Sequence, residues 1–401
     1  MFTTFRRSRL VRGAAVLSVL AVAASGCDGS GFTPGGGGGD DSPETTAAAV
    51  VKAKVTANVT AGATGVPVNT VLKVAAADGT LTSVTVSSKA GAVPGRIVGG
   101  ERWVAGARLE PGARYRIRAV ATSSDGSTVE SLTPFTTQAL GLDQQTYPSV
   151  APLQGETVGV GMPVIVHFDV PVTNKAAFER NMKVTATPAQ AGSWRWVSDH
   201  EAHWRPQAYW KAGTKVHVAV DVNSVPAGNG VFGQEDRELD FKIGDAHIYK
   251  VNAKTHQMKV FSNGKLLRTL PITTGKEGFT TRSGVKVIME KFATKRMNSE
   301  TVGIARGSSE AYDIDDVRWA MRLTSSGEFI HAAPWSVGSQ GVANVSHGCT
   351  GMSTENAGWL YSMSRRGDVV QYVGTTRPME PDNGYGDWNI SWADYQAASA
   401  L

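Results

Sequence analysis

Two cysteines are present among the 401 residues, and each ends a different short motif. Cys349 ends the run Ser346-His347-Gly348-Cys349, and His331 lies eighteen residues upstream of it. A thiolate is a strong nucleophile, and a cysteine needs a nearby base or cation to lower its pKa. Two histidines and one cysteine in so short a segment therefore predict a nucleophilic thiol that attacks a carbonyl.

The expected geometry around this thiol follows from side-chain alternation in extended backbone. If residues 345–349 are extended, His347 and Cys349 point to the same face. Gly348 would let a substrate backbone come close, and its N–H with that of Cys349 would stabilise an oxyanion. His331, on a preceding strand, would approach from the other side. The alternative is a buried, inert cysteine, which the polar, glycine-containing setting and the lack of a disulfide partner disfavour.

Cys27 ends a pattern typical of an export signal. Four arginines and no acidic residue lie in residues 1–26, and an apolar stretch, residues 14–24, precedes Ser25 and Gly26. The stretch is too short to span a bilayer. A cysteine at this place resembles a bacterial lipobox, although Ala24 stands where Leu is more common. We expect residues 1–26 to be a lipoprotein signal peptide and Cys27 to be lipidated; secretion with a free thiol is the alternative.

This interpretation places the protein in the cell envelope, lipid-anchored to the outer face of the membrane. The formal net charge of the chain is +5, and the arginines of residues 1–26 contribute +4, which leaves +1 for the remainder. Since the basic surplus belongs to the export signal, nothing indicates a nucleic-acid partner.

The rest of the chain divides by composition and periodicity. Residues 27–47 include five consecutive glycines and predict a flexible tether. Residues 48–141 and 142–245 show short alternating strands between turn signals, which predict two immunoglobulin-like β-sandwich domains. The run His200-Glu201-Ala202-His203 resembles a zinc-protease motif, but its histidines are three apart and no helical pattern surrounds them, so surface-loop histidines are expected.

Residues 246–375 predict a mostly β domain. Asn263-Gly264 between apolar runs predicts a tight hairpin, and helix-favouring sequence is limited to residues 353–364. Residues 376–401 form a C-terminal extension, whose aromatic part, residues 385–395, is expected to pack back against this domain because buried rings are the common case.

The segment from His331 to Cys349 resembles the His-then-Ser-His-Gly-Cys signature of the L,D-transpeptidase (YkuD-type) catalytic domain. The layout of signal, tether, two sandwiches and catalytic domain is similar to the lipoprotein members from mycobacteria and other actinobacteria. The resemblance implies a mainly β fold, in which two immunoglobulin-like β-sandwich domains are followed by a mostly β catalytic domain. It also implies that Cys349 is the nucleophile, that His331 is the general base and later acid, and that His347 and Gly348 shape the site.

Further site residues come from the same resemblance. Tyr312 falls in the lid over the substrate tunnel, Ser326 and Gly327 fall at a strand edge that contacts the donor peptide, and Ser346 is placed with these substrate-binding residues. Two positions depart from the pattern. Ala332 replaces a Ser whose main-chain carbonyl holds the imidazole, which implies little loss. Gly351 replaces a substrate-contacting Asn, which affects substrate positioning.

The implied reaction is acyl transfer on peptidoglycan stem peptides. Cys349 would attack the carbonyl of the third residue of a tetrapeptide donor, D-Ala would leave, and the thioester would pass to a neighbouring side-chain amine as a 3→3 cross-link. No metal or nucleotide cofactor is implied, and carbapenems are the expected inhibitors. Papain-like peptidases place Cys before His, unlike this chain. The sequence leaves open an L,D-carboxypeptidase or cysteine hydrolase, and a non-enzymatic adhesin or scaffold.

Overall fold

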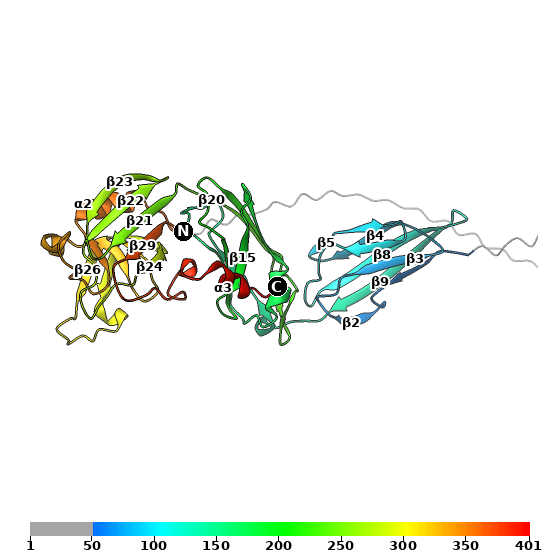
Figure 1. Ribbon diagram of the computed structural model, residues 1–401. Coiled ribbons are helices and arrows are strands. Elements are labelled where there is room, and N and C mark those ends of the chain that lie inside the picture. Colours follow the sequence, from blue (N-terminus) through cyan, green and yellow to red (C-terminus); the bar gives the residue numbers. More distant parts are fainter. Residues whose placement is uncertain (1–50) are drawn as a thin grey trace, which may run out of the picture. The chain divides into compact units, whose positions relative to one another are not determined.

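The computed structural model describes residues 51–401 (Figure 1). The predicted signal peptide, the tether and Cys27 lie outside the described residues. Within residues 51–401, the helices are all too short or too polar to cross a bilayer. Seven sheets and three hydrophobic cores make up this part of the chain.

The first sandwich packs two sheets around one core. Along β8, Tyr115, Ile117 and Ala119 are buried while the arginines between them are exposed, as the alternation predicted. The strands of the two sheets, in spatial order, are β1 (Lys54–Ala57), β3 (Lys73–Ala77), β7 (Arg102–Ala105) and β6 (Gly95–Val98), and then β2 (Ala63–Val66), β9 (Thr128–Thr137), β8 (Arg114–Ser123), β4 (Gly79–Ser88) and β5 (Gly91–Val93).

The second sandwich has two four-stranded sheets and a smaller three-stranded sheet around a larger core. The predicted apolar face of β17 is confirmed, since Val216, Val218 and Val220 are all buried. The short helix α1 (Lys175–Glu179) begins at Asn174, whose side chain accepts a hydrogen bond from the Ala177 N–H. The strands are β11 (Pro148–Ala151), β13 (Val164–Phe168), β16 (Glu201–Pro206) and β15 (Gly192–Trp196); β12 (Thr157–Val158), β20 (Arg237–Ile243), β17 (Lys215–Val220) and β14 (Met182–Thr187); and β10 (Gln145–Thr146), β19 (Val231–Gly233) and β18 (Pro226–Gly228).

Two further sheets form the domain that contains Cys349. Helix α2 (Thr354–Met363) buries Ala357 and Leu360 in the core between them, and the predicted helix over residues 353–364 is confirmed. Its N-terminus is capped by Ser353, whose hydroxyl accepts from the Asn356 N–H. The strands are β23 (Lys265–Pro271), β22 (Gln257–Ser262), β21 (His247–Asn252), β29 (Val369–Val373) and β24 (Gly284–Val287); and β25 (Glu290–Asn298), β26 (Asp313–Arg322), β27 (Phe329–Ala332) and β28 (Thr350–Met352).

The C-terminal extension, with helix α3 (Trp392–Ala397), packs mainly on the second sandwich. The guanidinium of Arg205 lies 4.6 Å from the ring of Trp388, 5.2 Å from that of Trp392 and 4.3 Å from that of Tyr395. The extension touches the catalytic domain at fewer places, such as Asn389 beside β24. The prediction that its aromatic part packs against the catalytic domain is therefore wrong in the main, because Arg205 attracts the ring faces.

The extension also explains a second wrong prediction. His203 is not in a surface loop but in strand β16, with only 4% of its surface exposed. Its Nδ1 lies 2.9 Å from Asp387 of the extension, and its Nε2 lies 3.0 Å from Glu201. Two carboxylates thus satisfy both ring nitrogens, which makes burial of this histidine possible.

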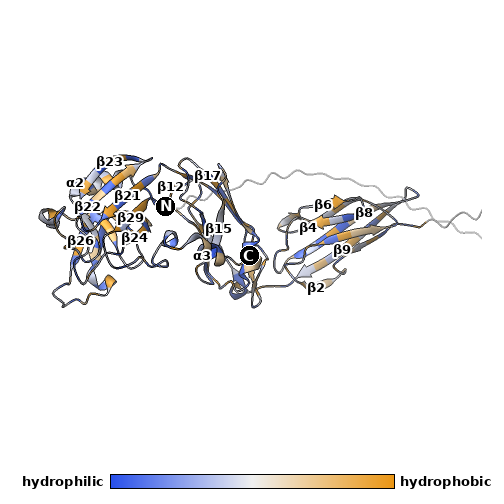
Figure 2. Ribbon diagram, viewed as in Figure 1, coloured by the Kyte–Doolittle hydropathy of each residue, from blue (hydrophilic) through white to orange (hydrophobic). Residues whose placement is uncertain are grey.

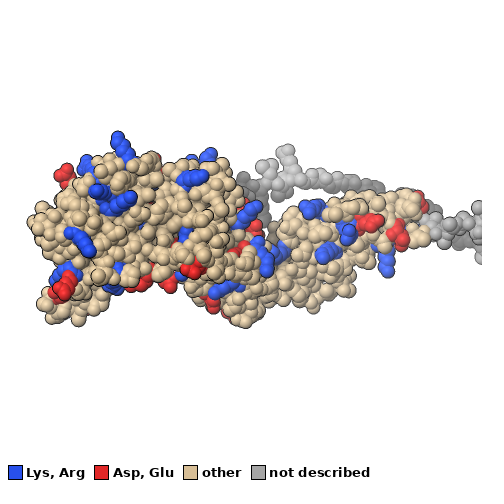
Figure 3. All heavy atoms as spheres, in the orientation of Figure 1, with Lys and Arg blue, Asp and Glu red and all other residues tan. Residues whose placement is uncertain are grey.

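The face of the molecule shown in Figure 3 carries no strong bias of charge. Hydrophobic and hydrophilic residues alternate along strands such as β8 and β9 (Figure 2). Basic and acidic side chains are interspersed over the face shown in Figure 3. This distribution agrees with the small net charge calculated for the chain after its first 26 residues.

Candidate active site

Parallel pairing of two short strands brings the predicted nucleophile and base together. In the β27–β28 ladder, Ile330 lies opposite Thr350 and His331 lies opposite Gly351. Cys349 directly precedes β28, so the ladder holds it beside His331. Such a parallel pair needs a long connection, which here is the segment that carries the Ser-His-Gly-Cys motif.

The segment before the cysteine is bent, so the extended backbone on which the expected alternation of His347 and Cys349 depended is not formed. Gly348 has φ of +121°, a conformation that favours glycine. The hydroxyl of Ser346 donates to the Cys349 carbonyl at 2.6 Å and accepts from the Gly348 N–H at 3.1 Å. Ser346 therefore braces the bend, and the Gly348 N–H is already occupied by a partner inside the protein. Thr281 secures the bend from outside, donating from Oγ1 to the Gly348 carbonyl at 2.7 Å.

The imidazole of His331 is held in one orientation. Its Nδ1 lies 2.8 Å from the carbonyl oxygen of Ala332, and a carbonyl only accepts. Nδ1 therefore carries the proton, and Nε2 is left as the acceptor. The expectation that the main-chain carbonyl of Ala332 holds the imidazole is confirmed. Burial lowers the pKa of His331, against the opposing effect of this hydrogen bond, so the ring is neutral at neutral pH.

The thiol of Cys349 is also neutral in this state. Burial raises its pKa to about 11, although the Phe329 backbone N–H acts in the opposite direction. The sulfur contacts the Gly327 carbonyl at 3.7 Å. Burial therefore disfavours both charged forms, the imidazolium and the thiolate. In a neutral thiol–imidazole pair of this kind, the thiol passes its proton to the imidazole as the sulfur attacks.

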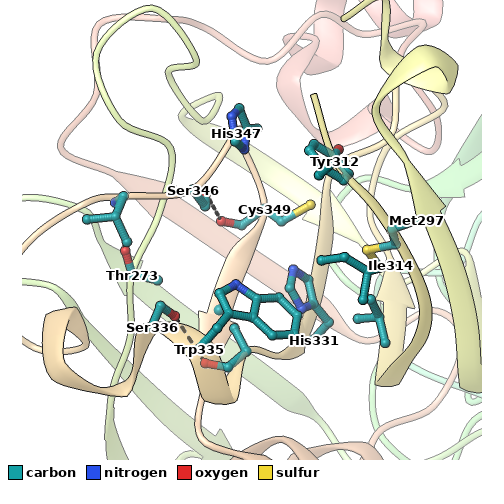
Figure 4. Close-up of a pocket in the computed structure, with 14 residues that line it drawn as sticks. Thr273, Met297, Tyr312, Ile314, His331, Trp335, Ser336, Ser346, His347 and Cys349 are labelled. Carbon is teal, nitrogen blue, oxygen red and sulfur yellow. Dashed lines mark hydrogen bonds between the residues drawn. The ribbon is translucent and has the colours of Figure 1, made fainter. Parts of the chain in front are cut away.

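Two cavities share Cys349 as a lining residue. One, of about 310 Å³, is lined by His331, Trp335, Ser346, His347 and Tyr312 among others, and it includes Cys349. The other, of about 270 Å³, is lined by Cys349 and Tyr312 together with Arg296, Arg322 and Gly327. Figure 4 shows the sulfur pointing towards Tyr312 and Met297, with the ring of His331 below it. Substrate groups can thus reach the thiol from two sides.

We call the segment between β25 and β26, residues 299–312, the lid; its Thr301, Val302 and Tyr312 line the second cavity. The ring centre of Tyr312 lies 5.2 Å from that of His347, and burial, followed by the charge of Cys349, raises the pKa of Tyr312 to about 12. Phe279 contacts His347 edge-on at 4.7 Å between ring centres. Glu310 accepts from the Nε2 of His347 at 2.6 Å. His347 therefore connects the nucleophile segment to the lid.

Comparison with known proteins agrees with this geometry. The profile of the L,D-transpeptidase catalytic domain (YkuD) matches residues 246–371, and that of a bacterial Ig domain (Big_10) matches residues 63–226. The chain is 37% identical to L,D-transpeptidase 2 of Mycobacterium tuberculosis, over 99% of this chain and 97% of that protein.

This chain belongs to the L,D-transpeptidase family.

Other relatives extend the comparison. L,D-transpeptidase 1 of Mycobacterium tuberculosis is 39% identical over 56% of this chain and 84% of its own length. A solved structure of LdtMt1 in complex with imipenem shares 38% identity and a TM-score of 0.50, covering 56% of this chain and 97% of that one. The mainly β fold, with immunoglobulin-like and L,D-transpeptidase domains, is therefore confirmed.

The L,D-transpeptidase structure places most of the predicted site residues around Cys349. Tyr312, Gly327 and His347 line one or both cavities. Ser326 lines neither of them, and it is held instead by Asn383 of the C-terminal extension at 2.9 Å.

Sequence reasoning missed several residues of the site. The missed residues are Lys276, Thr281, Lys286, Glu310 and Glu328, all of which act through tertiary contacts that no local motif signals. Within residues 51–401 no group of three His, Cys, Asp or Glu side chains is arranged to hold a metal ion.

Proposed function

We propose that this L,D-transpeptidase forms 3→3 cross-links between peptidoglycan stem peptides through a thioester on Cys349. The observation that supports this is the position of one thiol at the junction of two cavities, beside an imidazole whose Nε2 is free to accept. One cavity would hold the donor peptide and the other the acceptor amine. Cysteine acyl transfer needs this combination of nucleophile, base and two substrate approaches.

The proposed first half-reaction begins with both groups neutral. His331 Nε2 takes the thiol proton while the sulfur attacks the carbonyl of the third stem residue. A tetrahedral oxyanion forms, and because the Gly348 N–H is bonded to Ser346, we assign its stabilisation to the Cys349 N–H. The imidazolium then gives its proton to the leaving amine of D-Ala, and the thioester remains.

The second half-reaction reverses these roles. The side-chain amine of a neighbouring stem attacks the thioester carbonyl and loses its proton to His331. The C–S bond breaks, and the sulfur recovers the proton from the imidazolium. The products are the cross-linked peptide and the free thiol.

The direct test is incubation of the protein with a disaccharide-tetrapeptide, followed by mass spectrometry. We expect cross-linked dimers that are absent with Cys349→Ala. Tripeptide without dimers would instead identify an L,D-carboxypeptidase or hydrolase, in which water resolves the thioester. Absence of both turnover and carbapenem adducts would identify a non-enzymatic protein and overturn the proposal.

We further propose that the enzyme is exported and anchored by lipid at Cys27 on the outer face of the membrane. The support is the order of basic, apolar and small residues before Cys27. The two sandwiches, with boundaries at residues 48, 142 and 246, would then set the reach of the catalytic domain. Metabolic labelling with a fatty acid tests the anchor: label that disappears in Cys27→Ala supports it, and unlabelled soluble protein contradicts it.

A further inference from the structure

A buried cluster of charges lies against the segment that carries the nucleophile. Lys286 on β24 is fully buried, and its ammonium pairs with the carboxylate of Glu328. Arg282 donates to the other oxygen of that carboxylate twice, from its guanidinium at 3.1 Å and from its backbone N–H at 3.0 Å. Buried ion pairs recover their desolvation cost poorly and are weak contributors to stability. Stability alone therefore does not account for this cluster.

Two of its members are joined to the nucleophile segment through their chain neighbours. Glu328 directly follows Gly327, whose carbonyl faces the sulfur of Cys349 at 3.7 Å. Arg282 directly follows Thr281, which donates to the Gly348 carbonyl. The carboxylate that joins Arg282 to Glu328 thus fixes two of the contacts that hold the thiol.

The third member acts through an aromatic ring. The ammonium of Lys286 lies 3.8 Å from the ring centre of Tyr372 on β29. The hydroxyl of Tyr372 lies 2.6 Å from Oγ1 of Thr350, the residue after Cys349. The cluster therefore contacts the segment on both sides of the nucleophile.

The charges of the cluster also act on the sulfur itself. Burial is the largest cause of the raised pKa of Cys349; Glu328 raises this pKa further, and Lys286 lowers it by a smaller amount. In the other direction, burial lowers the pKa of Lys286 to about 8, against the effect of Glu328. The other titratable groups around the thiol are His331 on β27, Tyr312 of the lid, His347 and Tyr372 on β29, together with the basic residues of the second cavity, Lys295, Arg296 and Arg322. Lys286 is the one buried ammonium in this set.

We propose that Arg282, Lys286 and Glu328 are positioning residues that hold the Gly348–Thr350 segment, and with it the thiol of Cys349, beside its base. The charges of the cluster add to this role: the carboxylate reinforces the effect of burial on the thiol, and the ammonium opposes it, so that proton transfer to His331 remains accessible. The inference rests on the proposed nucleophilic role of Cys349.

The test measures the charge on the thiol directly, using the full-length chain. Alkylation of Cys349 by iodoacetamide is followed against pH by intact mass, with Cys349→Ala as the blank for Cys27. Lys286→Met removes the ammonium, while the ion pair between Glu328 and Arg282 remains. We expect the midpoint of the alkylation profile to rise by about one pH unit, and the rate at neutral pH to fall about tenfold. Acylation by imipenem should slow in parallel.

A second variant separates charge from packing. In Lys286→Met/Glu328→Gln both opposing charges are absent, and we expect alkylation to recover to within about threefold of the unsubstituted protein. Lys259→Met, an exposed lysine on β22, is the matched control and should change nothing. Thermal unfolding of each variant is recorded alongside.

Two results would overturn the inference. One is an unchanged alkylation profile in Lys286→Met. The other is a double variant as slow as the single one, which would show that the cluster serves packing alone. Neither result depends on cross-linking activity, so failure of the proposed reaction would be detected separately, by absence of dimers with the unsubstituted protein.

Discussion

The carboxylate of Glu310 in the lid accepts hydrogen bonds at 2.6 Å from His347 and at 2.6 Å from Lys276. Both bonds reach the same oxygen, so one lid residue connects two walls of the site. The hydrogen bond from Lys276, and to a lesser extent that from His347, lowers the pKa of Glu310. The connection is therefore present at neutral pH and is lost only as the pH falls through that lowered value.

Replacing Glu310 with Gln should loosen the lid. The amide keeps the size of the side chain but loses its charge, so its bonds to Lys276 and His347 weaken. We expect KM for a tetrapeptide donor to rise about three- to tenfold with a smaller change in kcat. Glu300→Gln, in the same lid and paired with Arg306 at 3.5 Å, is the control. Equal KM values in the two variants would argue against a lid held by Glu310.

The pH profile of acylation should report the neutral state of His331. Since burial lowers its pKa below the ordinary value of 6.5, the base stays active at neutral pH, and the rate should fall only below that value. His331→Ala should reduce acylation about 10²- to 10⁴-fold. His217→Ala, an exposed histidine on β17, should leave the rate unchanged. An acid limb centred above pH 7 would show that the ring is charged in the resting enzyme.

The buried ion pair between His203 and Asp387 should make the attachment of the C-terminal extension pH-dependent. Burial disfavours the imidazolium, but Asp387 and Glu201 outweigh it and raise the pKa of His203 to about 9. Because this is above the unfolded value of 6.5, the stabilisation is complete below pH 6.5 and is lost as the pH rises through 9. The difference corresponds to at most about 3 kcal/mol.

His203→Gln should remove that dependence. We expect the variant to be less stable at pH 6 and to approach the unsubstituted protein near pH 9.5, as measured by chemical denaturation at each pH. His200→Gln, on the same segment and bonded to the Phe168 carbonyl, is the control. Parallel stability curves for the His203 variant and the unsubstituted protein would disprove the charged pair.

Gly351 should not accept a side chain in this protein. A Cβ added there would lie 2.9 Å from the Cβ of Ala333 and 3.1 Å from Cγ2 of Thr273, neither of which can move aside alone. We expect Gly351→Ala to cost about 1–3 kcal/mol of stability. Gly338→Ala, in the exposed turn where a Cβ meets nothing within 4 Å, should be tolerated. Full stability of the Gly351 variant would refute the packing argument.

Local patterns predicted the elements well where one face of a strand is buried. The alternation in β8 and β17 identified both sandwiches, and Asn263-Gly264 forms the tight turn expected of it, with φ of 47° and 82°. His331 and Cys349 were likewise predicted to lie close together, and the pairing of β27 with β28 brings them together. In each case the signal lies within one short stretch of sequence.

Features that depend on distant partners were not predictable. His203 looked like a surface residue because its partner Asp387 lies 184 positions away. Lys286 and Glu328 are charged residues inside strands or beside them, and such residues are normally exposed unless a partner is known. The bend at Gly348 was missed because the alternation argument assumed extended backbone, whereas the hydroxyl of Ser346 stabilises a turn.

The position of Cys349 between two cavities has a consequence for inhibitor studies. The cavity on the Trp335 side and the cavity beside Arg296 share only Met297, Tyr312 and Cys349 among their lining residues, so we expect that a compound seated in one leaves most of the other free. Blocking one opening should therefore protect the sulfur only partly from small electrophiles. Inhibition measured with two compounds together, one for each opening, should show that the two compounds bind at the same time and do not exclude one another.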